Sequence, residues 1–386
     1  MKFWDTGIDT SIFDFEREKK TLIDNLEYLN SMGVEEQTLY KKYVELQTPS
    51  SINSRSDFAR YYDWQWSPTD INNKELTIKE ISALDPYIEI VERDDQLVKW
   101  TSVRKMIHTM SWTANPGRNV KIFVIDRTSG KLLGLISLAS DVTSIGCRDR
   151  YIGWGKEDKF ENGKLNSTTI ASTIVCTQPL GYNFLGGKLI AMMCTSPAVR
   201  EHWKEKYDDI LIGVTTTSLY GIHSQYNGIP HFKTVGETTG QTSQKPDDFI
   251  YKPWHDWLKQ NYYEEWHKAV SATGPKQNIL NRIYKHIDMS SKQFQHGFRR
   301  GVYFAQMYDN GNDFLCSKID ESELVMKQKM VDGVPYINNW WKRQATKRYV
   351  KLHEQGRLKP DCLYYHNAVG CSWEEMKNKY LKEVGR

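Results

Sequence analysis

The spacing of apolar residues changes between residues 119 and 240, and this change constrains the fold more than any other feature. Elsewhere the apolar residues recur at helical spacing, whereas here they form short continuous runs separated by turn residues. Such runs are typical of buried strands. The segment predicts a hairpin of strands at 120–125 and 132–140, a third strand at 168–176, helices at 188–195 and 197–207, and strands at 210–216 and 232–236. We therefore expect an α+β fold with a mixed-sheet core domain over residues 116–245.

The regions on either side of this core are expected to be mainly helical. In residues 1–115, Leu22, Leu26 and Leu29 recur at helical spacing and Gly33 follows as a stop signal. Further helices are predicted at 35–46, 77–84 and 94–114, and the Ser- and Asn-rich segment 50–75 is predicted to be a loop. Residues 246–386 are predicted to form a helical, basic C-terminal region.

Composition places the chain among ordinary globular proteins. It has 386 residues, of which 39% are hydrophobic and 26% charged, enough for two or three domains. No apolar run is long enough to span a membrane, and residues 1–5 do not begin an export signal. Six cysteines are scattered without a CxxC pair, so we expect reduced thiols in a cytoplasmic protein.

The positive charge is concentrated near the C-terminus. Residues 274–386 carry 20 Lys and Arg against 12 Asp and Glu, although the net charge of the whole chain is only +4. Arg343, Lys347 and Lys351 are spaced by four, beside Trp340 and Trp341. Such a stripe on one helical face suits nucleic-acid phosphates, with a solvated helix face as the alternative. The residues predicted to contact DNA are Arg299, Arg300, Lys342, Arg343, Lys347, Arg348 and Lys351.

A glycine-bearing segment between the third strand and the first helix of the core suits an anionic ligand, because backbone N–H groups point outward at a helix start. It contains Gln178, Leu180, Gly181, Gly186 and Gly187, and Tyr226 stands six residues before Phe232. This arrangement resembles the GNAT acyltransferase superfamily. The resemblance implies that the segment grips acyl-coenzyme A and that Tyr226 is a general acid. Tight packing of helix against strand is the alternative role of the glycines, and packing under the last strand that of Tyr226.

A second resemblance covers about 100 residues. The motif Arg148-Asp149-x-x-Ile152-Gly153-Trp154 precedes a terminal segment from Tyr226 to Gly240. These features resemble the Druantia A family of anti-phage and mobile-element proteins. The core also looks like the Mom-type DNA modification proteins of phages. Together these resemblances imply a protein that faces DNA, with other phage or defence proteins as partners and no membrane.

Three residues are candidates for catalysis: Tyr226, Asp149 and Ser224. Asp149 lies between two arginines, which favours an ionised carboxylate for proton transfer or, alternatively, a salt bridge in a turn. Ser224 is placed to orient a substrate or to form a turn. His223 and His231 flank the same loop without an acidic partner at metal-ligand spacing, so no metal site is predicted.

The leading functional hypothesis is a DNA-binding, acyltransferase-like protein that transfers a small acyl-derived group to an exocyclic amine of a base. Its donor is left open, with acyl-coenzyme A as one candidate cofactor. The chain lacks P-loop, HExxH, G-x-S-x-G and dinucleotide motifs, which argues against several other enzyme classes. A non-enzymatic DNA-binding subunit of a defence or counter-defence system is the main alternative. A third hypothesis is an acyltransferase acting on protein or a small molecule.

Overall fold

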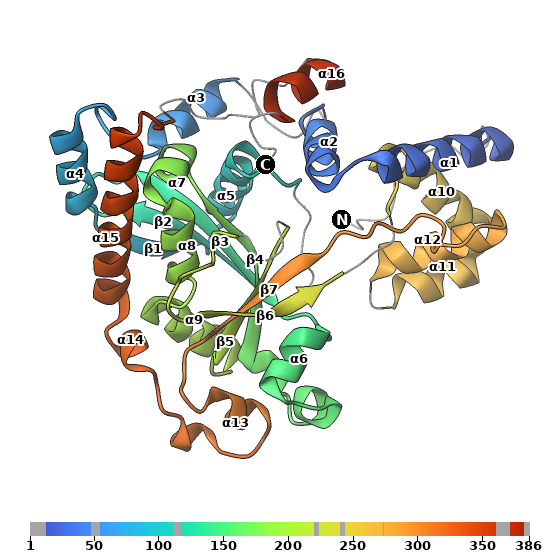
Figure 1. Ribbon diagram of the computed structural model, residues 1–386. Helices are drawn as coiled ribbons and strands as arrows, with labels where there is room; N and C mark the ends of the chain where they lie inside the picture. The colour runs from blue at the N-terminus through green and yellow to red at the C-terminus, as the bar shows by residue number, and fades with distance from the viewer. Residues whose placement is uncertain are drawn as a thin grey trace. The chain divides into compact units, whose positions relative to one another are not determined.

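The computed structural model (Figure 1) describes residues 13–47, 55–111, 117–219, 224–239, 244–272, 274–359 and 371–381. The chain divides into two compact units, and each is assembled from separate stretches of sequence. Residues 1–37 and 239–298 form one unit, here called the helical unit. Residues 38–238 and 299–386 form the other, the sheet unit. The three regions expected from the sequence, by contrast, follow one another along the chain.

The helical unit is built on a shared apolar core. Leu22 and Leu26 of the first helix are buried in one cluster with Trp254, Leu258 and Ile279. The Asp14 side chain accepts a hydrogen bond from the Arg17 amide and so begins that helix. The helices of this unit are α1 (Phe15–Ser31), α10 (Asp248–Asn261), α11 (Tyr263–Val270) and α12 (Pro275–His286).

The sheet unit contains a mixed sheet of seven strands within the described residues, in the order β1-β2-β3-β4-β5-β7-β6. Neighbouring strands are antiparallel except for β4 and β5, which are parallel. The expected mixed α+β architecture is therefore confirmed. The strands are β1 (Pro86–Ile90), β2 (Asn119–Asp126), β3 (Leu132–Ser140), β4 (Thr168–Cys176), β5 (Gly213–Ser218), β6 (Phe232–Thr238) and β7 (Arg300–Gln306).

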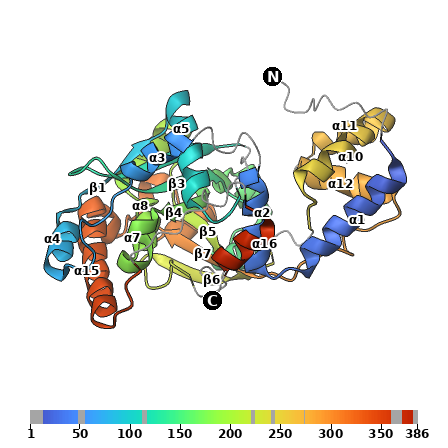
Figure 2. The same cartoon turned by 90° about the horizontal axis from the view of Figure 1, so that it is seen from above.

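Helices cover both faces of this sheet, as Figure 2 shows. On β2, Phe123 and Ile125 pack with α5 (Asp94–Ile107), whereas Ile122 and Val124 belong to the core formed with α8 (Gly186–Met193). This alternation follows from the two-residue period of a strand. Outside α8 lies α15 (Gly333–Glu354), which packs on α7 (Gln178–Phe184), α8 and α4 (Lys74–Ala83).

The remaining elements are short or peripheral. The other helices are α2 (Val34–Gln47), α3 (Arg55–Trp64), α6 (Gly146–Ile152), α9 (Pro197–Tyr207), α13 (Gly311–Leu315), α14 (Gln328–Val331) and α16 (Trp373–Met376). Short π-helical segments lie at Glu157–Glu161 and Lys377–Leu381, and short 3-10 helices lie at Lys164–Ser167 and Glu321–Glu323. Among the helices of the described segments, none is long and apolar enough to cross a membrane.

The flanking regions contribute strands that the sequence did not predict. β7 comes from the region predicted to be helical, yet it lies between β5 and β6, and its residues from Gly301 to Gln306 are all buried. The short run Val302-Tyr303-Phe304-Ala305 is apolar on both faces, as a central strand requires. β1 likewise comes from the region predicted to be helical before residue 115. The sheet therefore extends beyond residues 116–245.

Two segments that were not predicted to be helical are partly helical. Within 50–75, α3 forms and buries Tyr61 against α5 and β2, while residues 50–54 lie outside the described residues. The segment 178–187 begins with α7, because Pro179 in the first turn is preset for a helix. The helix predicted at 94–114 ends at Ile107, and residues 112–114 lie outside the described residues. The strand predicted at 210–216 is observed at Gly213–Ser218.

Candidate functional site

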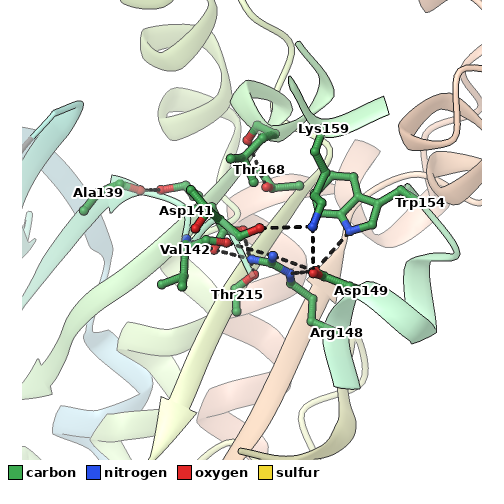
Figure 3. A network of polar contacts seen from close by, with 12 residues as sticks. Ala139, Asp141, Val142, Arg148, Asp149, Trp154, Lys159, Thr168 and Thr215 are labelled. Carbon is green, nitrogen blue, oxygen red and sulfur yellow. Dashed lines mark hydrogen bonds and ion pairs between the residues drawn. The ribbon is translucent and has the colours of Figure 1, made fainter. Parts of the chain in front are cut away.

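Arg148 is the centre of a buried polar network beside the end of β3 and the start of β5 (Figure 3). It lies on α6, and its side chain has no exposed surface. Its Nη1 atom lies 2.7 Å from Asp141 Oδ1, and its Nη2 atom lies 2.6 Å from Asp149 Oδ1. Nη2 also donates a hydrogen bond of 2.8 Å to the carbonyl of Val142. One guanidinium group therefore joins two carboxylates to the backbone that leaves β3.

The second cation of the network is Lys159. Its ammonium group lies 2.9 Å from Asp149 Oδ2, while the indole N–H of Trp154 donates a 3.1 Å hydrogen bond to Asp149 Oδ1. The Thr215 hydroxyl on β5 donates to Asp141 Oδ2 at 2.9 Å. Two buried cations thus face two carboxylates. Buried charges are tolerated only when they are paired and hydrogen-bonded in this way.

The network explains the residue types of the Arg-Asp-x-x-Ile-Gly-Trp motif. Arg148 and Asp149 form the ion pair, and Ile152 is buried in the core. Gly153 ends α6 in the left-handed conformation at φ 90°, which disfavours residues with a Cβ atom. The chain turns at Gly153, and this turn brings the indole N–H of Trp154 within hydrogen-bond distance of Asp149. The motif forms one local structural unit.

Asp149 is held ionised by these contacts. Partial burial raises its pKa, but the hydrogen bond from Lys159 and the charge of Arg148 outweigh burial and leave the pKa below its ordinary value. Both carboxylate oxygens already have partners. This geometry favours the salt-bridge alternative for Asp149 over proton transfer.

A second candidate region lies where β4 and β5 separate. The two strands pair only over Thr168–Ile170 and Gly213–Thr215. Beyond that point side chains reach the β4 backbone: the Thr216 hydroxyl donates to the Ala171 carbonyl at 3.3 Å, and Gln225 Nε2 donates to the Ile174 carbonyl at 3.3 Å. The protein's own side chains therefore occupy this edge of β4.

Tyr226 lies in the interior of this region. Its side chain is 6% exposed, its ring stacks on Phe232, and the ring of Tyr303 lies 5.1 Å away. The Thr216 hydroxyl lies 3.4 Å from the Tyr226 hydroxyl. Burial raises the pKa of Tyr226, so the phenol is protonated at neutral pH. The Ser224 hydroxyl accepts a hydrogen bond from the Tyr226 amide, as in a turn.

The predicted donor-binding glycines allow close packing. A Cβ atom on Gly186 would lie 2.6 Å from the Leu180 carbonyl, and one on Gly187 would overlap the Gln225 amide. At Gly181 the nearest contact would be an ordinary 3.5 Å, to Cys176 Sγ. Leu180 is fully buried, and Gln178 Nε2 lies 3.5 Å from the Ile107 carbonyl. These contacts favour the packing alternative for this segment.

The predicted basic stripe is exposed along α15. Arg343, Lys347 and Lys351 are exposed, while Trp341, Ala345 and Tyr349 on the opposite face are buried. Within the described residues, no carboxylate lies within salt-bridge distance of the three stripe residues. The stripe borders a groove of about 550 Å³ that also includes Ser82, Lys342, Thr346 and Glu354. The Glu354 carboxylate is paired with Lys74 at 2.8 Å. Positive charge is therefore available to an anionic partner there.

The other predicted DNA contacts differ in their surroundings. Lys342 donates to the Ser82 carbonyl, and the Arg348 guanidinium lies 4.8 Å from the centre of the Tyr182 ring. Arg299 faces Glu237 at 3.6 Å. Arg300 opens β7, and burial lowers the pKa of its guanidinium. Figure 1 shows β7 in the sheet and α15 along one side of the unit. Arg300 on β7 and Arg299 just before it are therefore separate from the stripe on α15.

His231 is buried, and its Nε2 atom lies 3.1 Å from the Thr195 hydroxyl. His223 lies outside the described residues. In the part of the chain that the structure describes, no group of three or more His, Cys, Asp or Glu residues is arranged to hold a metal ion.

Sequence reasoning missed Asp141, Lys159 and Thr215 as members of the network. Asp141 and Thr215 are 74 positions apart and meet only because β3 and β5 flank β4, with the end of β3 level with the start of β5. The one available signal was the position of Asp141 directly after an apolar strand.

The fold and the network define an α+β protein with a mixed sheet. A buried cluster of two cations and two carboxylates lies beside the end of β3 and the start of β5. The family model described as "Druantia protein DruA" matches residues 35–317, well over half of the chain, and the chain belongs to this family. The Druantia protein DruA of Escherichia coli (strain UMEA 4076-1) is 26% identical to it over 228 residues, which cover 54% of this chain and 55% of that protein. The chain thus spans about half the length of this curated relative. No solved structure matches it. The family resemblance is confirmed, and the GNAT-like and Mom-like resemblances gain no support from these comparisons.

Proposed function

We propose that this chain is a DNA-binding component of an anti-phage defence system. Membership of the Druantia A family supports the defence role, with other proteins of the system as partners. The exposed stripe of Arg343, Lys347 and Lys351 carries the DNA-binding part of the proposal. α15 lies outside the residues that the family model matches, so this part depends on the chain's own surface.

The chemistry of the stripe suits a phosphate backbone. Its three cations recur once per helical turn on one face, and the adjoining groove presents Lys342 and the Thr346 hydroxyl. Contacts to phosphates position a protein on DNA without regard to sequence. The proposed binding is therefore electrostatic and independent of sequence, and it weakens steeply with salt.

The test is the salt dependence of DNA affinity, measured by fluorescence anisotropy with a labelled duplex. Replacing Arg343, Lys347 and Lys351 together with Gln should reduce the slope of log K against log salt by about 2 to 3, the loss expected for three phosphate contacts. The matched control replaces the exposed Lys156, Lys268 and Lys329 with Gln, which removes the same charge elsewhere. Equal slopes for the two triple variants would contradict the proposal.

A second candidate function is base modification by an acyltransferase-like site on a GNAT-like core. The separation of the parallel strands β4 and β5, with Tyr226 beside it, favours this candidate. Asp149 would then act as a positioning residue through Arg148. The side chains that fill the separation argue against it, which is why it ranks second.

A further inference from the structure

The basic stripe of α15 continues toward the start of the helix as uncharged side chains. Tyr336 and Asn339 lie seven and four positions before Arg343, a spacing that places side chains on one face of a helix. They line a shallow hollow of about 660 Å³. Lys342 and Arg343 line both this hollow and the groove of about 550 Å³ beside the stripe. The two therefore form one continuous groove, here called the α15 groove.

The two ends of the α15 groove differ in charge. Its four cations lie between positions 342 and 351, a stretch of about 14 Å at 1.5 Å of rise per residue. At the other end the exposed carboxylate of Asp332 lines the groove, and among the described residues that form this wall no cation precedes Lys342. Phosphates of a bound nucleic acid are therefore favoured along the first stretch and disfavoured beside Asp332.

Tyr336 gives the end without cations a different chemistry. Its side chain is partly exposed and lines the groove, while Ile337 and Trp341 on the other side of the helix are buried and hold α15 in place. An accessible aromatic ring on a fixed helix offers a surface against which a base can stack. In a duplex each base is paired and stacked between its neighbours, so such a ring can reach only an unpaired base.

We infer that the α15 groove binds single-stranded DNA in preference to a duplex, with phosphates along the stretch from Lys342 to Lys351 and an unpaired base against the ring of Tyr336. Binding of this kind rests on the proposed function, because it uses the same cations. Tyr336 and Lys351 are separated by about 22 Å along the helix, so the site should hold on the order of four nucleotides. Stacking tolerates every base, in keeping with binding that is independent of sequence.

Fluorescence anisotropy at one salt concentration tests the preference with three labelled probes of equal length. These are an oligo-dT strand, an abasic strand and a duplex. The original chain should bind oligo-dT about 5-fold or more tightly than the abasic strand, the factor that one stacked base supplies. It should also bind oligo-dT more tightly than the duplex. Charge alone favours the duplex, which presents the phosphates of both strands, so a preference for the single strand reports the contact with the base.

Variants of Tyr336 test the role of the ring. Tyr336→Ala should bind oligo-dT no more tightly than the abasic strand, while its affinities for the abasic strand and the duplex stay unchanged. Tyr336→Phe keeps the ring and should bind oligo-dT like the original chain. Tyr263→Ala removes an exposed tyrosine of α11, outside the groove, and is the control that should also bind like the original chain.

The outcomes separate single-strand binding from the DNA binding on which it rests. An abasic strand or a duplex that binds the original chain as tightly as oligo-dT overturns the inference and leaves the DNA-binding proposal standing. Equal losses for oligo-dT and the abasic strand in Tyr336→Ala also overturn it, because a damaged groove would then explain them without stacking. Absence of binding to all three probes overturns both. The three probes are compared on the original chain, so the test decides even if Tyr336→Ala does not fold.

Discussion

Arg148 Nη1 lies 2.7 Å from Asp141 Oδ1, and neither side chain has any exposed surface. The pair joins α6 to the end of β3, and through Thr215 it also reaches β5. It therefore fixes the helix that follows β3 against the end of β3 and the first residues of β5. The arrangement stabilises the fold only while all of its charges are present. If one charged group is removed, its partner is left buried without a compensating charge.

Arg148→Met should destabilise the sheet unit strongly. The substitution leaves Asp141 buried without its cation and leaves Asp149 with Lys159 and the Trp154 indole N–H. Breaking a buried ion pair on one side costs about 3 to 5 kcal/mol of unfolding free energy. Urea unfolding measures this loss, and Arg150→Met, at the exposed neighbouring arginine, should change stability by about 0.5 kcal/mol or less. A similar loss for both variants would show that the network does not support the fold.

Asp149→Asn separates a structural role from a catalytic one. The amide keeps the shape of the carboxylate but loses its charge, so Lys159 and Arg148 each lose a charge-assisted contact. We expect a loss of about 2 to 3 kcal/mol in unfolding free energy. Exposed Glu157→Gln is the control. An Asp149→Asn protein as stable as the original chain would contradict the structural role.

The strands β2, β3 and β4 were predictable because each is rich in apolar or β-branched residues and bounded by turn residues. β7 was not, because its apolar run is short and the surrounding sequence is helical. Its place between β5 and β6 depends on pairing with residues about 60 to 90 positions earlier, which no local pattern encodes.

The candidate sites show the same division. The exposed face of α15 followed from the four-residue spacing of its cations, because helical periodicity is local. The partners of Asp149 are near it in the sequence, at Arg148, Trp154 and Lys159. The contacts of Gly187 are set by tertiary packing instead, because the Gln225 side chain that covers it comes from a distant loop.

His231 should make the stability of the fold depend on pH. Burial, together with the charges of Lys327 and Lys329, lowers its pKa to about 3, whereas an unfolded histidine titrates near 6.5. Between these values the unfolded chain binds more protons than the folded one, so stability falls as pH falls from about 6.5 to 3. The contribution is on the order of 4 kcal/mol at the acid end.

The measurement is urea unfolding at a series of pH values, compared between the original chain and His231→Gln. The variant cannot take up this proton, so its stability should fall less steeply below pH 6.5. Parallel pH profiles for the two proteins would show that His231 is not buried as a neutral group.

Gly187→Ala should destabilise the protein, because the added methyl group overlaps the Gln225 amide. Overpacking of this kind costs about 1 to 3 kcal/mol. Adding Gln225→Ala should recover part of the loss, since the two residues are in direct contact. Gly181→Ala is the control. Gly181 lies within α7, and a Cβ atom there would meet only Cys176 Sγ at an ordinary 3.5 Å, so the change should be neutral or stabilising. If Gly187→Ala is as stable as Gly181→Ala, packing does not explain this glycine.

Tyr226→Phe should fold with a loss of only about 0.5 to 1.5 kcal/mol, because the ring keeps its contacts with Phe232 and Tyr303 and only the hydroxyl near Thr216 is removed. A stable variant makes a clean functional test. Nucleosides from the DNA of cells that express each form are compared by mass spectrometry, with Tyr303→Phe as the control, since its hydroxyl bonds Asn227 in the same core. The DNA-binding proposal expects identical nucleosides and equal DNA affinity for all three proteins. A new nucleoside mass that disappears only with Tyr226→Phe would instead establish the base-modifying candidate, because no packing role of the phenol would alter DNA chemistry.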